Sequence, residues 1–130
     1  MRKAPVPAPD GAFDADAVWT LFEGRIDRMR HVWRITRSTL PGYVDALAAA
    51  VDAADWAVAA RHAHSLAGSA SNFGAHALVA TARRIEDHAG DGHVPVDDVQ
   101  EARAQFDALC TAMSAWLDLL PGAPGAPPAA

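Results

Sequence analysis

The chain has 130 residues, of which 51% are apolar, and a formal net charge of −5 at pH 7 with acidic and basic residues interspersed. A chain of this length has room for one domain with one core, and its charge pattern offers no clustered basic face for nucleic acid. The one cysteine, Cys110, excludes an internal disulfide, and no run approaches the roughly 18 consecutive apolar residues of a membrane-spanning helix, so we expect a cytoplasmic protein.

Both ends of the sequence are rich in proline, glycine and alanine and show no helical period. Residues 4–12 have the sequence APVPAPDGA, and residues 121–130 have the sequence PGAPGAPPAA. We expect flexible segments over residues 1–12 and 121–130, flanking one helical domain over residues 13–120. The N-terminal stretch also lacks the apolar core of a signal peptide, so we expect none.

Three helical segments are expected in the first half of the domain. A short helix begins near Asp14, because acidic residues suit the positive end of a helix dipole. Gly24 weakens its continuation, and a second helix is expected over residues 25–38. Since proline is tolerated in the first turn of a helix, Pro41 predicts a third helix over residues 40–51.

Three more helical segments are expected in the second half. They cover residues 55–70, residues from about Asn72 to just before Gly90, and residues from Pro95 to Leu120. Glycine commonly follows the last turn of a helix, as Gly90 would here. Short connections favour antiparallel neighbours, so the expected fold class is all-α, an up-down four-helix bundle with an additional short N-terminal helix.

The helix expected over residues 55–70 directs one histidine away from the core. Its apolar stripe follows alternating spacings of three and four residues: Trp56, Ala59, Ala63, Leu66 and Ala70. His64 lies about 120° from the centre of that stripe, so we expect its ring to be exposed. The positions expected around it on the surface are almost all small: Ala57, Ala60, Arg61, Ala67, Gly68 and Ser71.

Gly68 is an unusual choice inside a helix, since glycine there costs roughly 1 kcal/mol relative to alanine. One turn from an exposed histidine, it removes bulk where another protein would approach. We therefore expect a partner-docking surface that comprises Ala60, Ala67, Gly68 and Ser71. A neutral imidazole is nucleophilic near pH 7 and can accept and return a phosphoryl group, although an ordinary solvated histidine remains the alternative.

The segment AHSLAGSASNFGA over residues 63–75, with Ile85 and Glu86 beyond it, resembles the histidine phosphotransfer (HPt) family. The family pattern is His-x-Leu-Lys-Gly-Ser, then a Gly-Ala pair ten and eleven residues after the histidine, and a Leu-Glu-like pair that closes the next helix. Leu47 and the Asp55-Trp56 pair are similar to the sequence that precedes this pattern in the family. The resemblance covers residues 40–90, and the outer helices match only as amphipathic helices.

By this resemblance His64 is the phosphoacceptor, through its Nε2 atom, and Gly68 gives clearance to the receiver domain of a response regulator. Glu86, or a neighbour on the same helix, looks like the family position that hydrogen-bonds Nδ1 and so fixes the tautomer of the imidazole. A plain surface carboxylate is the alternative for Glu86. Gly74 and Ala75 would allow the helix expected from about Asn72 onward to start close to the helix expected over residues 55–70.

The chain departs from the family at Ala67, where a lysine usually steadies the phosphoryl group. Arg61, one turn before His64, can supply a positive charge with bidentate geometry, or it can be a solvating arginine. Without such a charge we expect slower transfer or a more labile phosphohistidine.

The remaining histidines are expected on the surface or at helix ends: His31, His62, His76, His88 and His93. The sequence has no HxxxH or HExxH pair, no glycine-rich phosphate loop and no Gly-x-Ser-x-Gly elbow. We therefore expect a phosphoryl carrier without an ATP site, not an enzyme, that binds no cofactor or metal itself. Mg²⁺ would come with the partner receiver domain.

The expected partners are the receiver domains of response regulators and a (hybrid) sensor histidine kinase. No nucleic acid or membrane is expected, and the chain is expected to be a monomer. Two alternatives remain open from the sequence. One is an HPt-like module that docks a kinase or regulator without being phosphorylated. The other is a metal-binding helical bundle that uses the six histidines.

Overall fold

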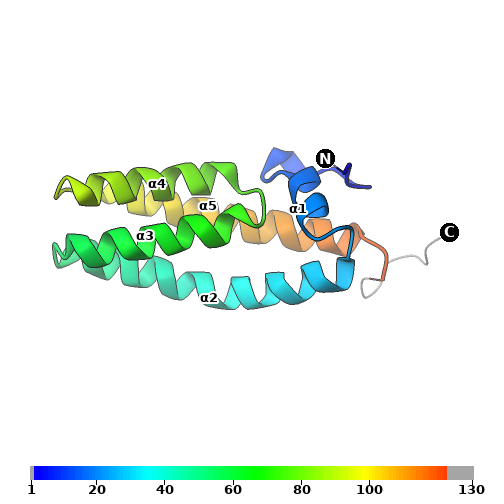
Figure 1. Cartoon of the computed structure of the whole chain (residues 1–130), viewed down its shortest axis with the longest axis horizontal. Coiled ribbons are helices and arrows are strands. Elements are labelled where there is room, and N and C mark those ends of the chain that lie inside the picture. Colours follow the sequence, from blue (N-terminus) through cyan, green and yellow to red (C-terminus); the bar gives the residue numbers. More distant parts are fainter. Residues whose placement is uncertain (1, 123–130) are drawn as a thin grey trace.

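The structure is a computed structural model that describes residues 2–122, and over these residues it contains helices and no strand (Figure 1). A 3₁₀ turn, η1, and five α-helices follow one another along the chain: η1 (Pro9–Gly11), α1 (Ala15–Leu21), α2 (Ile26–Asp52), α3 (Trp56–Ser71), α4 (His76–Gly90) and α5 (Val96–Leu119). Of the tail expected to be flexible over residues 121–130, residues 123–130 lie outside the described residues.

Helices α2 to α5 form an up-down four-helix bundle, and α1 packs against one end of it (Figure 1). The expected all-α bundle with an additional N-terminal helix is confirmed. Because α3 and α4 are shorter than α2 and α5, α1 lies beyond the α3–α4 turn beside the longer helices. Within residues 2–122 no helix is long and apolar enough to cross a membrane.

The core explains why α3 and α4 lie close together. The core-facing positions of α3 are mostly alanines, and Ala59, Ala63 and Ala70 are fully buried. Such small side chains allow two helix backbones to approach closely, and α3 packs more extensively against α4 than against any other helix. The larger core side chains come mainly from the other helices: Met29, Leu40, Leu47, Leu78, Ile85, Leu109, Met113 and Trp116.

The expected break between helices over residues 25–38 and 40–51 is wrong, because α2 continues through Pro41. A proline inside a helix costs about 3 kcal/mol, since it lacks an N–H group and its ring presses on the carbonyl four residues earlier. Pro41 is exposed, and buried side chains on both sides of it hold the helix against one core: Met29, Trp33, Val44 and Leu47. Burial of each such side chain contributes about 1.5–3 kcal/mol, which outweighs the proline penalty.

The expected start of the fifth segment at Asn72 is also wrong, because α4 begins at His76 and residues 72–75 form a tight turn. Gly74 makes this turn with φ +60, and its carbonyl accepts the N–H of Asp14 at 2.9 Å. A Cβ atom on Gly74 would lie 2.7 Å from the Asp14 carbonyl oxygen, so the start of α1 is seated against this glycine. At the other end, α4 includes Gly90, and Gly92 adopts the positive φ.

The N-terminal stretch, expected to be flexible over residues 1–12, is packed against the bundle from residue 2 onward. The Trp116 indole N–H donates to the Val6 carbonyl at 2.8 Å, and the Ala4 N–H donates to the Asp16 carboxylate at 2.7 Å. These residues therefore have defined contacts with the bundle. An extended proline-rich segment makes no hydrogen bonds of its own, so its carbonyls are available to the bundle.

Candidate functional site

His64 lies in the middle of α3 and projects into solvent, as expected. Asp55 caps the helix by accepting the N–H of Val58, and the buried alanines of α3 fix which face of the helix meets the core. The His64 side chain is 76% exposed. It is therefore accessible to another protein.

Glu86 on α4 holds the ring of His64 across the gap between the two helices. Its Oε1 atom lies 3.2 Å from Nδ1 of His64, which is the contact expected from the family resemblance. When the carboxylate accepts a hydrogen bond, Nδ1 carries the proton and Nε2 has a lone pair. The pair thus presents an oriented nucleophilic nitrogen to solvent.

The surface beside this pair is bare on one side. Gly68 is exposed, and a Cβ built on it would have no heavy atom within 4 Å. Ser71 is also exposed and uses its hydroxyl to donate to the Gly68 carbonyl at 2.7 Å. Ala60 is half-buried. Of the expected docking surface, the residues with exposed atoms are therefore Ala60, Gly68 and Ser71.

The placement of Ala67 on that docking surface is wrong, because its methyl group is only 3% exposed. A helical wheel of α3 alone shows its apolar stripe but not how wide an arc the neighbouring helices bury. Packing of α4 against α3 widens the buried arc so that it includes Ala67. The position where the family has a lysine is therefore buried at its Cβ in this chain.

Two exposed arginines lie near the pair. Arg61 is one turn before His64 on α3, and Arg83, which sequence reasoning missed, is one turn before Glu86 on α4. Within residues 2–122 neither guanidinium makes an ion pair or a hydrogen bond. Both are thus available to an anion that arrives at His64.

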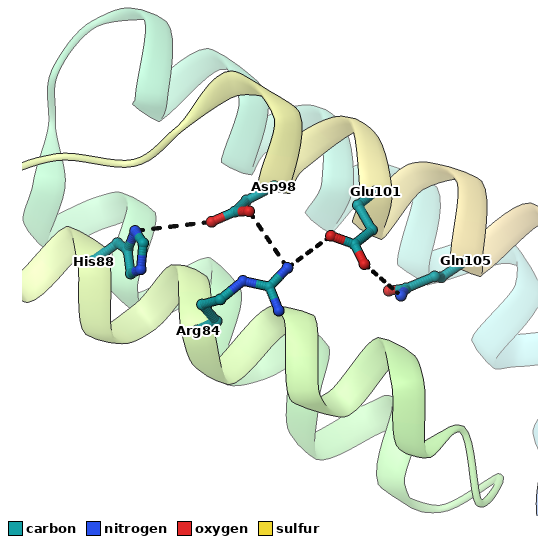
Figure 2. Close-up of polar contacts among 5 residues, drawn as sticks. All are labelled: Arg84, His88, Asp98, Glu101 and Gln105. Atoms are coloured by element: carbon teal, nitrogen blue, oxygen red, sulfur yellow. Dashed lines mark hydrogen bonds and ion pairs between the residues drawn. The ribbon is translucent and has the colours of Figure 1, made fainter.

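A polar network on the opposite flank of α4 fixes that helix against α5 (Figure 2). Arg84 donates to Asp98 at 3.3 Å and to Glu101 at 2.7 Å, and His88 lies 3.8 Å from Asp98. The hydrogen bond to Asp98 raises the pKa of Arg84. Residues two apart on a helix face nearly opposite ways, so holding Arg84 against α5 turns Glu86 toward α3. The four-residue spacing of Arg84 and His88, which puts both on one face of α4, could have indicated this network from the sequence.

The other candidate groups lie away from this pair. His62 is on the α2 flank of α3, where its ring centre is 6.4 Å from that of Tyr43. Burial raises the pKa of the Cys110 thiol, which keeps it protonated and weakly nucleophilic. Among residues 2–122 there is no group of three or more His, Cys, Asp or Glu side chains placed to bind a metal ion.

Comparison with known proteins agrees with this geometry. Residues 31–116 match the model of the Hpt domain family, and no curated protein matches the chain. The fold is similar to that of histidine-containing phosphotransfer protein B (HptB) from Pseudomonas aeruginosa PAO1, with a TM-score of 0.78 and 20% identity over 85% of this chain and 97% of that one. Because the family match extends over most of the domain and includes His64, the chain belongs to the Hpt domain family, whose members act in two-component phosphorelays.

Proposed function

We propose that this protein relays a phosphoryl group between receiver-domain aspartates, or from a sensor kinase to a response regulator, through a phosphohistidine at His64. The observation that carries the proposal is the exposed imidazole of His64 with its Nδ1 atom 3.2 Å from the Glu86 carboxylate. This arrangement leaves Nε2 as the reactive nitrogen.

The transfer exchanges one bond for another. The Nε2 lone pair attacks phosphorus, and the bond between phosphorus and the aspartyl oxygen breaks as the aspartate leaves with the electron pair. The product imidazole carries phosphorus on Nε2 and a proton on Nδ1, so its ring is positively charged. The Glu86 carboxylate lies where it can balance that charge. The reverse reaction returns the group to a second receiver aspartate.

Docking would use the bare surface beside the histidine. Gly68 adds no side chain that would keep a receiver domain away, and Ala60 and Ser71 extend this low surface along α3. Two rigid surfaces that place the reacting atoms in line supply much of the rate in such a reaction. The Mg²⁺ that assists phosphoryl transfer belongs to the receiver in this proposal, and Arg61 is a candidate to steady the phosphoryl group.

The direct test incubates the full chain with a phosphorylated receiver domain and measures label that is lost in acid and kept in alkali. The His64→Gln variant should take up no label while its helicity is unchanged, because only the nucleophile is removed. The His62→Gln variant is the matched control and should be labelled normally, since His62 lies on the other flank of α3. The Glu86→Ala variant should be labelled about 10- to 100-fold more slowly, because the ring is no longer oriented. Label on the His64→Gln variant would refute the proposal.

A docking module that is never phosphorylated is the second candidate function. The buried Ala67, at the position of the family lysine, is the observation that favours it. It predicts that the receiver binds the His64→Ala variant as well as the unaltered protein, and that neither one takes up label.

A further inference from the structure

We propose that Arg83 supplies the positive charge that binds the phosphoryl group on His64, in the role that the family gives to a lysine at the position of Ala67. The inference rests on the proposed phosphotransfer function and adds a residue of α4 to the site. It follows from the register of two helices and from the charges at their junction.

The register of α3 and α4 is set at two places. The N–H of Ala75 bonds to the Ala70 carbonyl at the turn, and His64 contacts Glu86 midway along the helices. The two helices are antiparallel (Figure 1). Arg83, which lies between Ala75 and Glu86 on α4, is therefore opposite the part of α3 between Ala70 and His64.

That part of α3 contains the bare surface and the buried alanine. Ala67 cannot offer a charge, and Gly68 leaves open space next to it. Arg83 is exposed and lies one turn, roughly 5 Å, from Glu86 on α4. Its long side chain thus begins on the same side of His64 as the missing lysine, whereas Arg61 lies on the other side along α3.

The neighbouring residue, Arg84, is also an arginine but faces α5 instead. Arg84 follows Arg83 in sequence but is rotated by about 100°, and its guanidinium is occupied by Asp98 and Glu101 on α5 (Figure 2). The same network keeps α4 from rotating about its axis. Arg83 therefore lies on the exposed side of α4, between the face of Arg84 and the face of Glu86, and within residues 2–122 no carboxylate pairs with it.

The site needs such a cation once it is loaded. A phosphoryl group on Nε2 brings about two negative charges, and the Glu86 carboxylate, which lies at Nδ1, balances only the positive charge of the ring. A guanidinium offers parallel N–H donors that match two phosphoryl oxygens. Arg83 would bind those oxygens while the bond from phosphorus to the donor breaks and the bond to Nε2 forms, and it would form no covalent bond itself.

The test compares two phosphoryl donors on the full-length protein. Phosphoramidate presents a phosphoryl group without a protein surface, whereas a phosphorylated receiver presents both. The Arg83→Ala variant should be loaded roughly three- to tenfold more slowly by either donor, and Arg83→Lys should recover part of the rate. Arg34→Ala, which removes an exposed arginine from α2, is the matched control and should load normally.

A second measurement follows the phosphorus NMR signal of the loaded protein through a pH titration. Loss of a nearby cation should raise the midpoint of the phosphoryl titration in Arg83→Ala and leave it unchanged in Arg34→Ala. Equal loading and equal midpoints in these two variants would overturn the role of Arg83 while His64 phosphorylation stands. A defect seen only with the receiver, or only in Arg61→Ala, would also overturn it. Failure of the unaltered protein to load from any donor would instead refute the proposed function.

Discussion

Gly68 and Gly74 are glycines for two different physical reasons. Gly68 is inside α3 with open space around it, so nothing in the folded chain itself requires a glycine there. Gly74 has φ +60, and a Cβ atom on it would meet the backbone of Asp14. Gly74 is thus explained by the fold, whereas Gly68 is not, as the proposed docking of a partner would require.

We predict opposite effects when each glycine is replaced by alanine. Gly68→Ala should raise the free energy of unfolding by about 0.5–1 kcal/mol, because alanine is the better helix former. Gly74→Ala should lower it by at least about 1–2 kcal/mol, because of the left-handed backbone and the clash. Urea unfolding followed by tryptophan fluorescence measures both changes.

For Gly68→Ala, the rate of loading by a receiver should change in the opposite direction to the stability. Gly68→Ala should be loaded more slowly than the unaltered protein by a receiver and equally fast by phosphoramidate, since only docking is obstructed. A Gly68→Ala variant that is destabilised would contradict the assignment of this glycine to docking.

Features of the candidate site that lie on one helix or match a motif could be predicted from the sequence. The helical wheel predicted the exposure of His64, and the family resemblance predicted its role and the contact with Glu86. The burial of Ala67 and the place of Arg83 were not predicted, because both depend on how α4 packs against α3. A single helical wheel contains no information about the register of a neighbouring helix.

At the scale of elements, Asp14 joins α1 to the start of α4. Its carboxylate accepts the Ala17 N–H at 3.0 Å as the N-cap of α1 and lies 3.2 Å from Nε2 of His76. The hydrogen bond from Ala17, followed by the one from His76, lowers the pKa of Asp14 below its usual 3.8. The folded protein therefore favours the ionised carboxylate.

We predict that this carboxylate makes part of the stability depend on acid. A depressed pKa gives stability that is fully present above about pH 4 and is lost as the pH falls through the pKa of the folded state. Asp14→Asn keeps a capping side chain but cannot ionise, so its unfolding free energy should fall less between pH 4 and pH 2. Asp14→Ala should lose about 1 kcal/mol at pH 7 as well.

Urea unfolding at a series of pH values measures these differences. Asp55→Asn, at the N-cap of α3, is the control for exchanging a capping aspartate. If Asp14→Asn and the unaltered protein lose the same stability on acidification, the pairing with Ala17 and His76 does not have the effect argued here.

Helices α1 and α3, which have the capping residues Asp14 and Asp55, and helix α5, which has an unbroken apolar period, were predicted well. The two errors have tertiary causes. Pro41 is a local signal to end a helix, and it is overridden by burial of side chains on both sides of it. Helix α4 starts later than expected because the turn at Gly74 contacts Asp14, which is 60 residues earlier in the chain.

At the scale of the whole molecule, the N-terminal segment completes the end of the bundle. Val6 provides the only described acceptor for the buried Trp116 indole, and the Phe13 ring packs edge-on against Trp116 at 5.3 Å. Ala4 is buried as well. Figure 1 shows the N-terminal segment at the end of the bundle near α1, whereas His64 is in the middle of α3 (Trp56–Ser71). The segment therefore belongs to the stability of the fold and not to the site.

We predict that deletion of residues 1–12 lowers the free energy of unfolding by about 1–3 kcal/mol, because the Trp116 N–H loses its acceptor and apolar contacts are lost. Loading of His64 from phosphoramidate should be unchanged. Trp116→Phe in the full chain removes the donor itself, so combining it with the deletion should cost less than the sum of the two separate changes. Urea unfolding of the four proteins measures this coupling. Additive losses would show that the bond from Trp116 to Val6 is not what ties the segment to the bundle, and a deletion without any loss would show that the segment does not stabilise the domain.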